Sequence, residues 1–180
     1  VGENQVQEAE AKFEGMERPD QLVSLHLIGH LQANKVRRAV ALFDVIQSVD
    51  SARLASRIDS IAQEMNRQVA IYIQVNIGSE ATKEGVRPDQ GVELAEFVAT
   101  CRSIELAGLM AVPPHMENLE AVRPYFRMLR ELRDGVCQLE QYRGAALGLS
   151  MGMTEDFEVA IEEGATMVRL GSAIWGPRPT

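Results

Sequence analysis

Two segments near the C-terminus combine residue types that bind phosphate. Ser150-Met151-Gly152-Met153 and Arg169-Leu170-Gly171-Ser172 each follow an apolar run, and each places a glycine beside a hydroxyl group. Glycine lets the backbone approach a ligand, and a hydroxyl can donate to a phosphate oxygen. Backbone N–H groups after Gly171 would also point at an anion, as at a helix N-terminus. The segments therefore predict a phosphate site, although two tight turns after strands would give the same pattern.

The second segment also carries a charge inside an apolar run, because Arg169 lies between Val168 and Leu170. A charged side chain at such a position needs a partner. One use is to donate a hydrogen bond to a ring nitrogen that stays unprotonated, which would weaken the electron-sink character of a pyridoxal ring. The other is a structural salt bridge to Glu162 or Glu163, and the sequence leaves both open.

Other polar residues are weaker candidates for ligand or metal binding. Asn4 could reach a ligand or cap the helix that follows it, and His26 is typical of a histidine held in a core. The three histidines have no metal-ligand spacing. Cys101 and Cys137 are expected to be reduced and partly buried thiols. We therefore predict no metal site, and the sequence contains no glycine-rich nucleotide loop or nucleophile elbow.

Short apolar runs alternate with amphipathic helical patterns along the whole chain. Most runs are continuous apolar segments, which is typical of strands buried on both faces. One helix is expected over about 52–66, and Pro88 is expected in the first turn of another that runs to Cys101. Thr154 is expected to cap a later helix that Gly164 ends in a left-handed conformation. The predicted strands are 1–2, 23–28, 43–48, 69–77, 104–112, 145–150 and 166–170.

The alternation of strand and helix predicts an α/β protein with a parallel sheet. A doubly wound sheet and a closed (β/α)8 TIM barrel both satisfy it. About seven strands are present, and the first is cut short at Val1. We therefore favour one barrel domain over residues 1–180 that lacks its N-terminal β/α unit. In such a barrel the functional groups lie at the C-terminal ends of the strands, where both phosphate-like segments occur.

The composition and net charge exclude some classes of binding partner. The 180 residues suit one domain, and 46 % of them are hydrophobic, which is enough for a core. A net charge of −8 argues against binding to nucleic acid or to an anionic membrane surface. No apolar stretch is long enough to span a bilayer, and no signal peptide opens the chain. We expect a cytoplasmic protein, a monomer, with neither kind of partner.

Ordered motifs then connect the chain to a known family. They are Gly2-Glu3-Asn4-x-Val6-Gln7-Glu8, His26-x-Ile28-Gly29-x-Leu31-Gln32-x-Asn34-Lys35, Gln74-Val75-Asn76-Ile77, Lys83-x-Gly85, Gly108-Leu109-Met110, Leu149-Ser150-Met151-Gly152-Met153 and Val168-Arg169-Leu170-Gly171. In this order, and over nearly the whole chain, they resemble the pyridoxal phosphate homeostasis proteins. These are single-domain barrels related to the N-terminal domain of alanine racemase.

The resemblance implies a non-catalytic carrier of pyridoxal 5'-phosphate that affects vitamin B6 and amino-acid balance. It implies that Arg169 faces the pyridine nitrogen and that Asn4 lies close to the ring. It also implies that Ser150, with the backbone at Gly171 and Ser172, holds the phosphate. No catalytic residue is expected.

The same resemblance places the Schiff-base lysine on a strand upstream of the Gly2-Glu3-Asn4 motif. The lysines of this chain are Lys12, Lys35 and Lys83, and none of them corresponds to it. Two other hypotheses therefore stay open. One is a racemase-like or decarboxylase-like enzyme that uses the same cofactor. The other is a phosphate-binding remnant that binds no cofactor covalently.

Overall fold

The computed structural model describes residues 1–14, 24–78, 80 and 83–176. Within these residues, seven strands form one sheet, and all the pairings between neighbours are parallel. The strands are β1 (Gly2–Glu3), β2 (His26–Leu27), β3 (Val45–Val49), β4 (Val69–Gln74), β5 (Ile104–Met110), β6 (Gly148–Met153) and β7 (Met167–Arg169). Each of the seven predicted strands is present with shifted ends, and Val23 lies outside the described residues.

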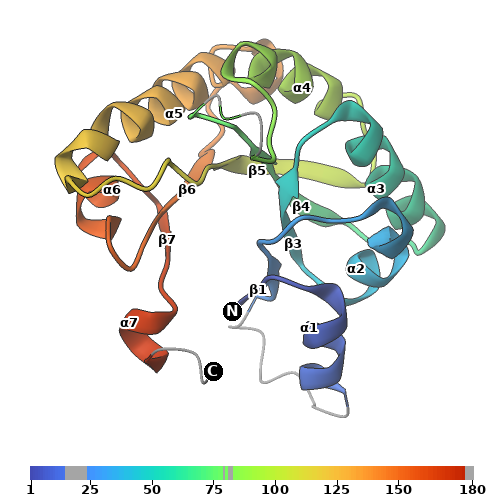
Figure 1. Cartoon of the computed structure of the whole chain (residues 1–180). Coiled ribbons are helices and arrows are strands. Elements are labelled where there is room, and N and C mark those ends of the chain that lie inside the picture. The colour runs from blue at the N-terminus through green and yellow to red at the C-terminus, as the bar shows by residue number, and fades with distance from the viewer. Residues whose placement is uncertain (15–23, 79, 81–82, 177–180) are drawn as a thin grey trace.

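The strand order is sequential from β1 to β7, and this decides between the two predicted architectures. A doubly wound sheet reverses its strand order at a switch point, whereas a barrel adds each strand beside the previous one. Figure 1 shows the sheet curling so that its edge strands, β1 and β7, come round towards each other. The protein is a nearly closed α/β barrel of the TIM type.

The α-helices cover the outer side of the curled sheet (Figure 1). Ser51 caps α3, because its side chain accepts a hydrogen bond from the Leu54 N–H at 3.3 Å. Ile58 and Ile61 are buried on the same face of α3 as Leu54 and pack into the core. The described helices are α1 (Val6–Phe13), α2 (Val36–Leu42), α3 (Ala52–Glu64), α4 (Gly91–Val98), α5 (Arg123–Val136), α6 (Phe157–Glu162) and α7 (Ser172–Trp175). Short 3-10 helices are η1 (Ala33–Lys35), η2 (Pro88–Gln90), η3 (Leu119–Val122) and η4 (Glu140–Tyr142).

The predicted cap of α6 was wrong. The helix begins at Phe157 with Asp156 as its N-cap residue, so Thr154 lies two positions earlier in the loop after β6. Asp156 Oδ1 accepts a hydrogen bond from the Met153 N–H at 2.7 Å, which folds this loop back on itself. Gly164 follows the helix with φ +94°, as predicted for its left-handed end. The consequence is that the Thr154 hydroxyl is available for another role.

Tyr72 of β4 packs against β5 and β6. A Cβ atom at Gly108 would lie 2.6 Å from Tyr72 Cε1, and one at Gly148 would lie 2.8 Å from the Tyr72 hydroxyl oxygen. The Tyr72 side chain is buried, so β5 and β6 need glycine where it lies against them. None of the helices in the described ranges is long and apolar enough to cross a bilayer.

Candidate functional site

Two hydroxyl groups meet at the C-terminal ends of β6 and β7. Thr154 follows β6, and Ser172 is the first residue of α7. Ser172 Oγ donates a hydrogen bond to Thr154 Oγ1 at 3.3 Å, and neither side chain is buried. This edge is where β/α barrels place their ligands, often with a phosphate in the loops after the last two strands.

Gly171 exposes the backbone beside this hydroxyl pair. A Cβ atom there would meet nothing within 4 Å, so no described residue covers that side of Gly171. The first N–H groups of a helix have no carbonyl partner within the helix. Thr154 and Ser172 add two hydroxyl groups to this turn, and hydroxyl and backbone N–H groups are donors suited to a phosphate.

Arg169, two residues before Gly171, turns into the barrel. Its Nη1 donates to the carbonyl oxygen of Ser150 at 2.7 Å and to the Ser150 hydroxyl at 2.9 Å, and its Nη2 donates to the Ala111 carbonyl at 2.9 Å. The guanidinium group has five N–H donors, and its Nε–H has no acceptor among the described residues. With three of the five N–H groups used, the Nε–H and one Nη2–H are left for a ligand.

Burial lowers the pKa of Arg169 to about 10, although the charge of Asp156 acts in the opposite direction. The three acceptors in contact with the guanidinium group are neutral oxygen atoms. A cation held among neutral acceptors is stabilised by any further acceptor that reaches it. The ring nitrogen of an aromatic ligand is such an acceptor.

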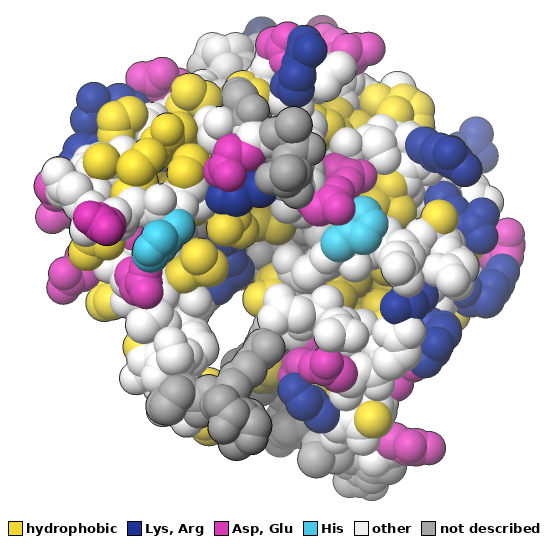
Figure 2. All heavy atoms as spheres, viewed as in Figure 1, with side chains coloured by type: hydrophobic (Ala, Val, Ile, Leu, Met, Phe, Trp, Pro, Cys, Tyr) yellow, Lys and Arg dark blue, Asp and Glu magenta, His cyan; other side chains and the backbone are white. Residues whose placement is uncertain are grey.

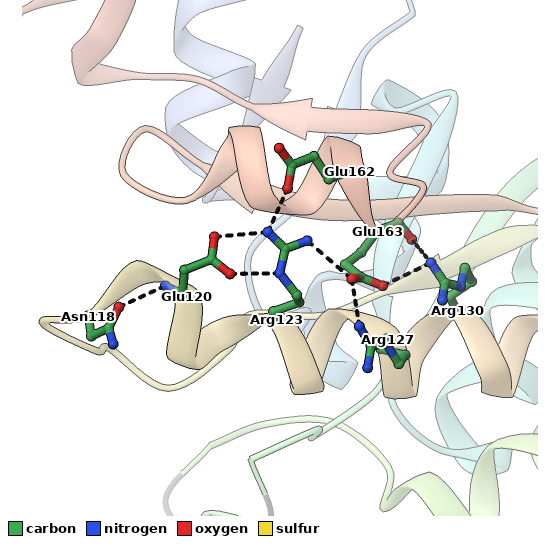
Figure 3. Close-up of polar contacts among 7 residues, drawn as sticks. All are labelled: Asn118, Glu120, Arg123, Arg127, Arg130, Glu162 and Glu163. Atoms are coloured by element: carbon green, nitrogen blue, oxygen red, sulfur yellow. Dashed lines mark hydrogen bonds and ion pairs between the residues drawn. The ribbon is translucent and has the colours of Figure 1, made fainter.

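The salt bridge considered for Arg169 is not formed, because its two candidate partners pair with other arginines. Arg123 Nη2 lies 2.5 Å from Glu162 Oε2. Glu163 lies against three arginines of α5 at 3.2, 3.1 and 2.8 Å, and Figure 3 shows their side chains around its carboxylate. These arginines are Arg123, Arg127 and Arg130. The cluster ties α5 to α6 on the outer layer of the fold and leaves Arg169 free to face the barrel interior.

Ser150 does not lie with the hydroxyl pair of Thr154 and Ser172. It is fully buried in the middle of β6, and its hydroxyl donates to Gln47 Oε1 at 2.6 Å while accepting from Arg169. This arrangement disfavours the expectation that Ser150 holds a phosphate, because its hydroxyl is 0 % exposed and its proton is directed at Gln47 inside the barrel. Thr154, four residues on, has the same chemistry at the rim.

Asn4 lies at the expected edge. It follows β1, is exposed, and does not cap α1, whose N-cap residue is Gln5. Its backbone packs so closely on Gly29 that a Cβ atom there would overlap the Asn4 carbonyl oxygen. Gly29, in the His26-to-Lys35 motif, therefore fixes the position of Asn4.

The barrel interior also contains a polar group that sequence reasoning missed. Gln47 is completely buried on β3, and its Nε2 lies 2.8 Å from His26 Nδ1 and 3.1 Å from Met167 Sδ. In the sequence, Gln47 could have been noticed as a polar residue within the apolar run 43–48. The Thr154 hydroxyl could have been noticed because Thr154 follows a predicted strand at its C-terminal end. Burial lowers the pKa of His26, so its ring is neutral near pH 7.

Two of the three lysines are engaged in ion pairs. Lys12 Nζ lies 2.9 Å from Glu3 Oε2, and Lys83 Nζ lies 2.8 Å from Glu80 Oε1. Lys35 ends η1, which follows β2. An ammonium group held in an ion pair is not a free amine nucleophile.

Viewed as in Figure 1, the molecule has an opening below and to the left of its centre (Figure 2). The model of the alanine racemase N-terminal domain matches residues 1–179. The chain belongs to this family. Within it, the chain is 46 % identical to the pyridoxal phosphate homeostasis protein of Aquifex aeolicus over 177 residues, which cover 98 % of this chain and 76 % of that protein.

Solved structures agree with the described fold. PipY of Synechococcus elongatus without pyridoxal phosphate matches with a TM-score of 0.89 at 35 % identity, over 97 % of this chain and 80 % of that one. The form of PipY with pyridoxal phosphate bound has a TM-score of 0.82. Alanine racemase of Clostridium difficile, at 16 % identity and a TM-score of 0.68 over 99 % of this chain and 45 % of that one, shares the fold.

Proposed function

We propose that this chain binds pyridoxal phosphate at the rim of the barrel and takes part in its homeostasis as a carrier, without catalysing a reaction on it. The observation that carries the proposal is the pairing of the rim hydroxyls of Thr154 and Ser172 with a part-buried cation, Arg169, three residues before Ser172. Relatives named pyridoxal phosphate homeostasis protein, and the PipY structure with pyridoxal phosphate bound, support the same ligand.

The residues fit the two ends of the cofactor. Thr154, Ser172 and the backbone at Gly171 offer donors to the phosphate, and the Nε–H of Arg169 offers one to the ring nitrogen. Asn4 follows β1 and is exposed at the same rim, where it would lie close to the ring. When bound, pyridoxal phosphate supplies an aldehyde and an electron-withdrawing ring.

The protonation states favour a carrier over an enzyme. The guanidinium group of Arg169 can only donate, so a ring nitrogen that faces it must accept with its lone pair and stay unprotonated, which weakens the ring as an electron sink. The neutral His26 cannot act as a base through Nδ1, because that lone pair accepts from Gln47. The Ser150 hydroxyl donates its proton in a hydrogen bond to Gln47 Oε1. These interior groups hold their protons in place and do not transfer them.

The test is a titration followed by the fluorescence of Trp175, the single tryptophan, which lies in α7 three residues after Ser172. Pyridoxal phosphate is expected to quench it saturably, and pyridoxal without phosphate is expected to bind at least about tenfold more weakly, because it lacks the charge-assisted hydrogen bonds. Arg169→Ala should weaken binding and leave the fold intact. Arg143→Ala, at an exposed arginine in the loop before β6, is the matched control.

Three results would overturn the proposal. Absence of saturable quenching, confirmed by equilibrium dialysis, would refute the binding site. Racemisation of alanine by the chain in the presence of pyridoxal phosphate would refute the non-catalytic role and favour the racemase-like alternative. Equal binding of inorganic phosphate and pyridoxal phosphate would reduce the site to a phosphate-binding module.

A further inference from the structure

A directed chain of hydrogen bonds crosses the barrel interior behind the proposed cofactor site. It begins at Arg169 on β7, passes through Ser150 on β6 and Gln47 on β3, and ends at His26 on β2. The three steps measure 2.9, 2.6 and 2.8 Å. Gln47 and Ser150, the two middle members, are 0 % exposed.

The chemistry of each group fixes the direction of the chain. Arg169 can only donate, so the Ser150 oxygen accepts from it and the Ser150 proton must go elsewhere. The Gln47 Oε1 atom receives that proton at 2.6 Å. The amide NH2 of Gln47 then faces two acceptors, His26 Nδ1 and Met167 Sδ, and uses one N–H on each. Every member has one arrangement that satisfies all its partners.

We propose that Gln47 is a positioning residue that sets the guanidinium plane of Arg169 for the ring nitrogen of the cofactor. The inference rests on the proposed function. Without Gln47, the Ser150 hydroxyl has no acceptor on the β3 side, and its proton competes with the Arg169 N–H groups for the remaining oxygen atoms. The guanidinium group then loses one of the two contacts that orient Nη1.

The experiment separates orientation from general loss of binding. Pyridoxal phosphate and 1-deazapyridoxal phosphate, in which C–H replaces the ring nitrogen, are titrated against the chain by Trp175 fluorescence. The ratio of their affinities reports the contact between Arg169 and the ring nitrogen. A hydrogen bond from a charged donor predicts a preference of at least about tenfold for the ring with nitrogen.

Gln47→Leu is expected to reduce this preference to about threefold or less while both compounds still bind through their phosphates. Gln68→Leu is the matched control. Gln68 is exposed, precedes β4 at the opposite end of the barrel, and donates to the Arg102 carbonyl at 3.2 Å. The Gln68→Leu variant should keep the full preference for pyridoxal phosphate over the 1-deaza compound.

The outcomes keep the two proposals apart. If the unmodified chain binds neither compound, the proposed function fails. If it prefers the ring with nitrogen and Gln47→Leu keeps that preference, the positioning role is wrong and the proposed function stands. If Gln47→Leu does not fold by circular dichroism, Ser150→Ala replaces it, because it removes the hydroxyl through which Gln47 acts. An unchanged preference in Ser150→Ala would equally overturn the inference.

Discussion

The contact of Glu163 with three arginines gives a sharp prediction for stability. Glu163 is only 4 % exposed, and its carboxylate joins α6 to Arg123, Arg127 and Arg130 of α5. Glu163→Gln keeps the shape and removes the charge. Breaking a fully buried ion pair costs about 3–5 kcal/mol. The arginine side chains are between 24 % and 51 % exposed and can turn to water, so we expect a loss of about 2 kcal/mol.

The pH dependence of this loss has a defined sign. Burial acts to raise the pKa of Glu163, but hydrogen bonds from Arg127 and Arg123 and the nearby positive charges outweigh it, so the pKa lies below its ordinary value of 4.5. The folded state therefore favours the ionised carboxylate. Its contribution is complete above pH 4.5 and is lost as the pH falls through the lowered pKa. The difference between Glu163→Gln and the unmodified chain should shrink over that range.

Urea unfolding at pH 7 and at successively lower pH measures both effects. With a slope of about 2 kcal/mol per molar urea, the midpoint at pH 7 should fall by about 1 M in Glu163→Gln. Glu158→Gln, at an exposed acid on the same helix, is the control. The reasoning is refuted if the two variants lose the same stability at pH 7, or if the loss in Glu163→Gln does not diminish towards acid.

Three further predictions concern single side chains. Thr154→Val should weaken pyridoxal phosphate binding about tenfold and leave the binding of pyridoxal without phosphate unchanged, as measured by fluorescence titration. Gly29→Ala should destabilise the chain by about 1–3 kcal/mol in thermal unfolding, because the new Cβ overlaps the backbone of Asn4, whereas Gly135→Ala, with nothing within 4 Å, should not destabilise it. Tyr142→Phe removes a 2.8 Å hydrogen bond to a carbonyl of α4 and should cost about 1 kcal/mol. Burial raises the pKa of Tyr142 to about 12, so the unmodified chain should lose stability as the pH rises from about 10, and Tyr142→Phe should lose less.

The sequence predicted the barrel because strand burial and helix amphipathicity are local patterns. Continuous apolar runs marked most of the seven strands, and the helix expected over about 52–66 is present as α3, which Ser51 caps. Strand ends were less accurate. The run 69–77 ends as a strand at Gln74, because the chain there turns into a loop whose hydrogen bonds come from Asn76.

The site was predictable only in part, because it depends on contacts between distant strands. Arg169, Gly171 and Ser172 were marked by a charge and a glycine within one short segment. Whether the partner hydroxyl belonged to Ser150 or Thr154 depended on which of them faces the interior, and a register shift between β6 and β7 at this point hides that from periodicity. Gln47 was missed because its contacts lie 103 and 120 residues away in the chain.

Those separations have a kinetic consequence. Each strand pairs with its immediate successor, so the sheet can grow by closing short loops of one β/α unit at a time. The contacts of Gln47 with Ser150 and Met167 skip over two or more of these units and can form only once β6 and β7 have curled back to β3. We therefore expect Gln47→Leu to speed unfolding far more than it slows folding, since an interaction absent from the transition state acts on the unfolding rate alone.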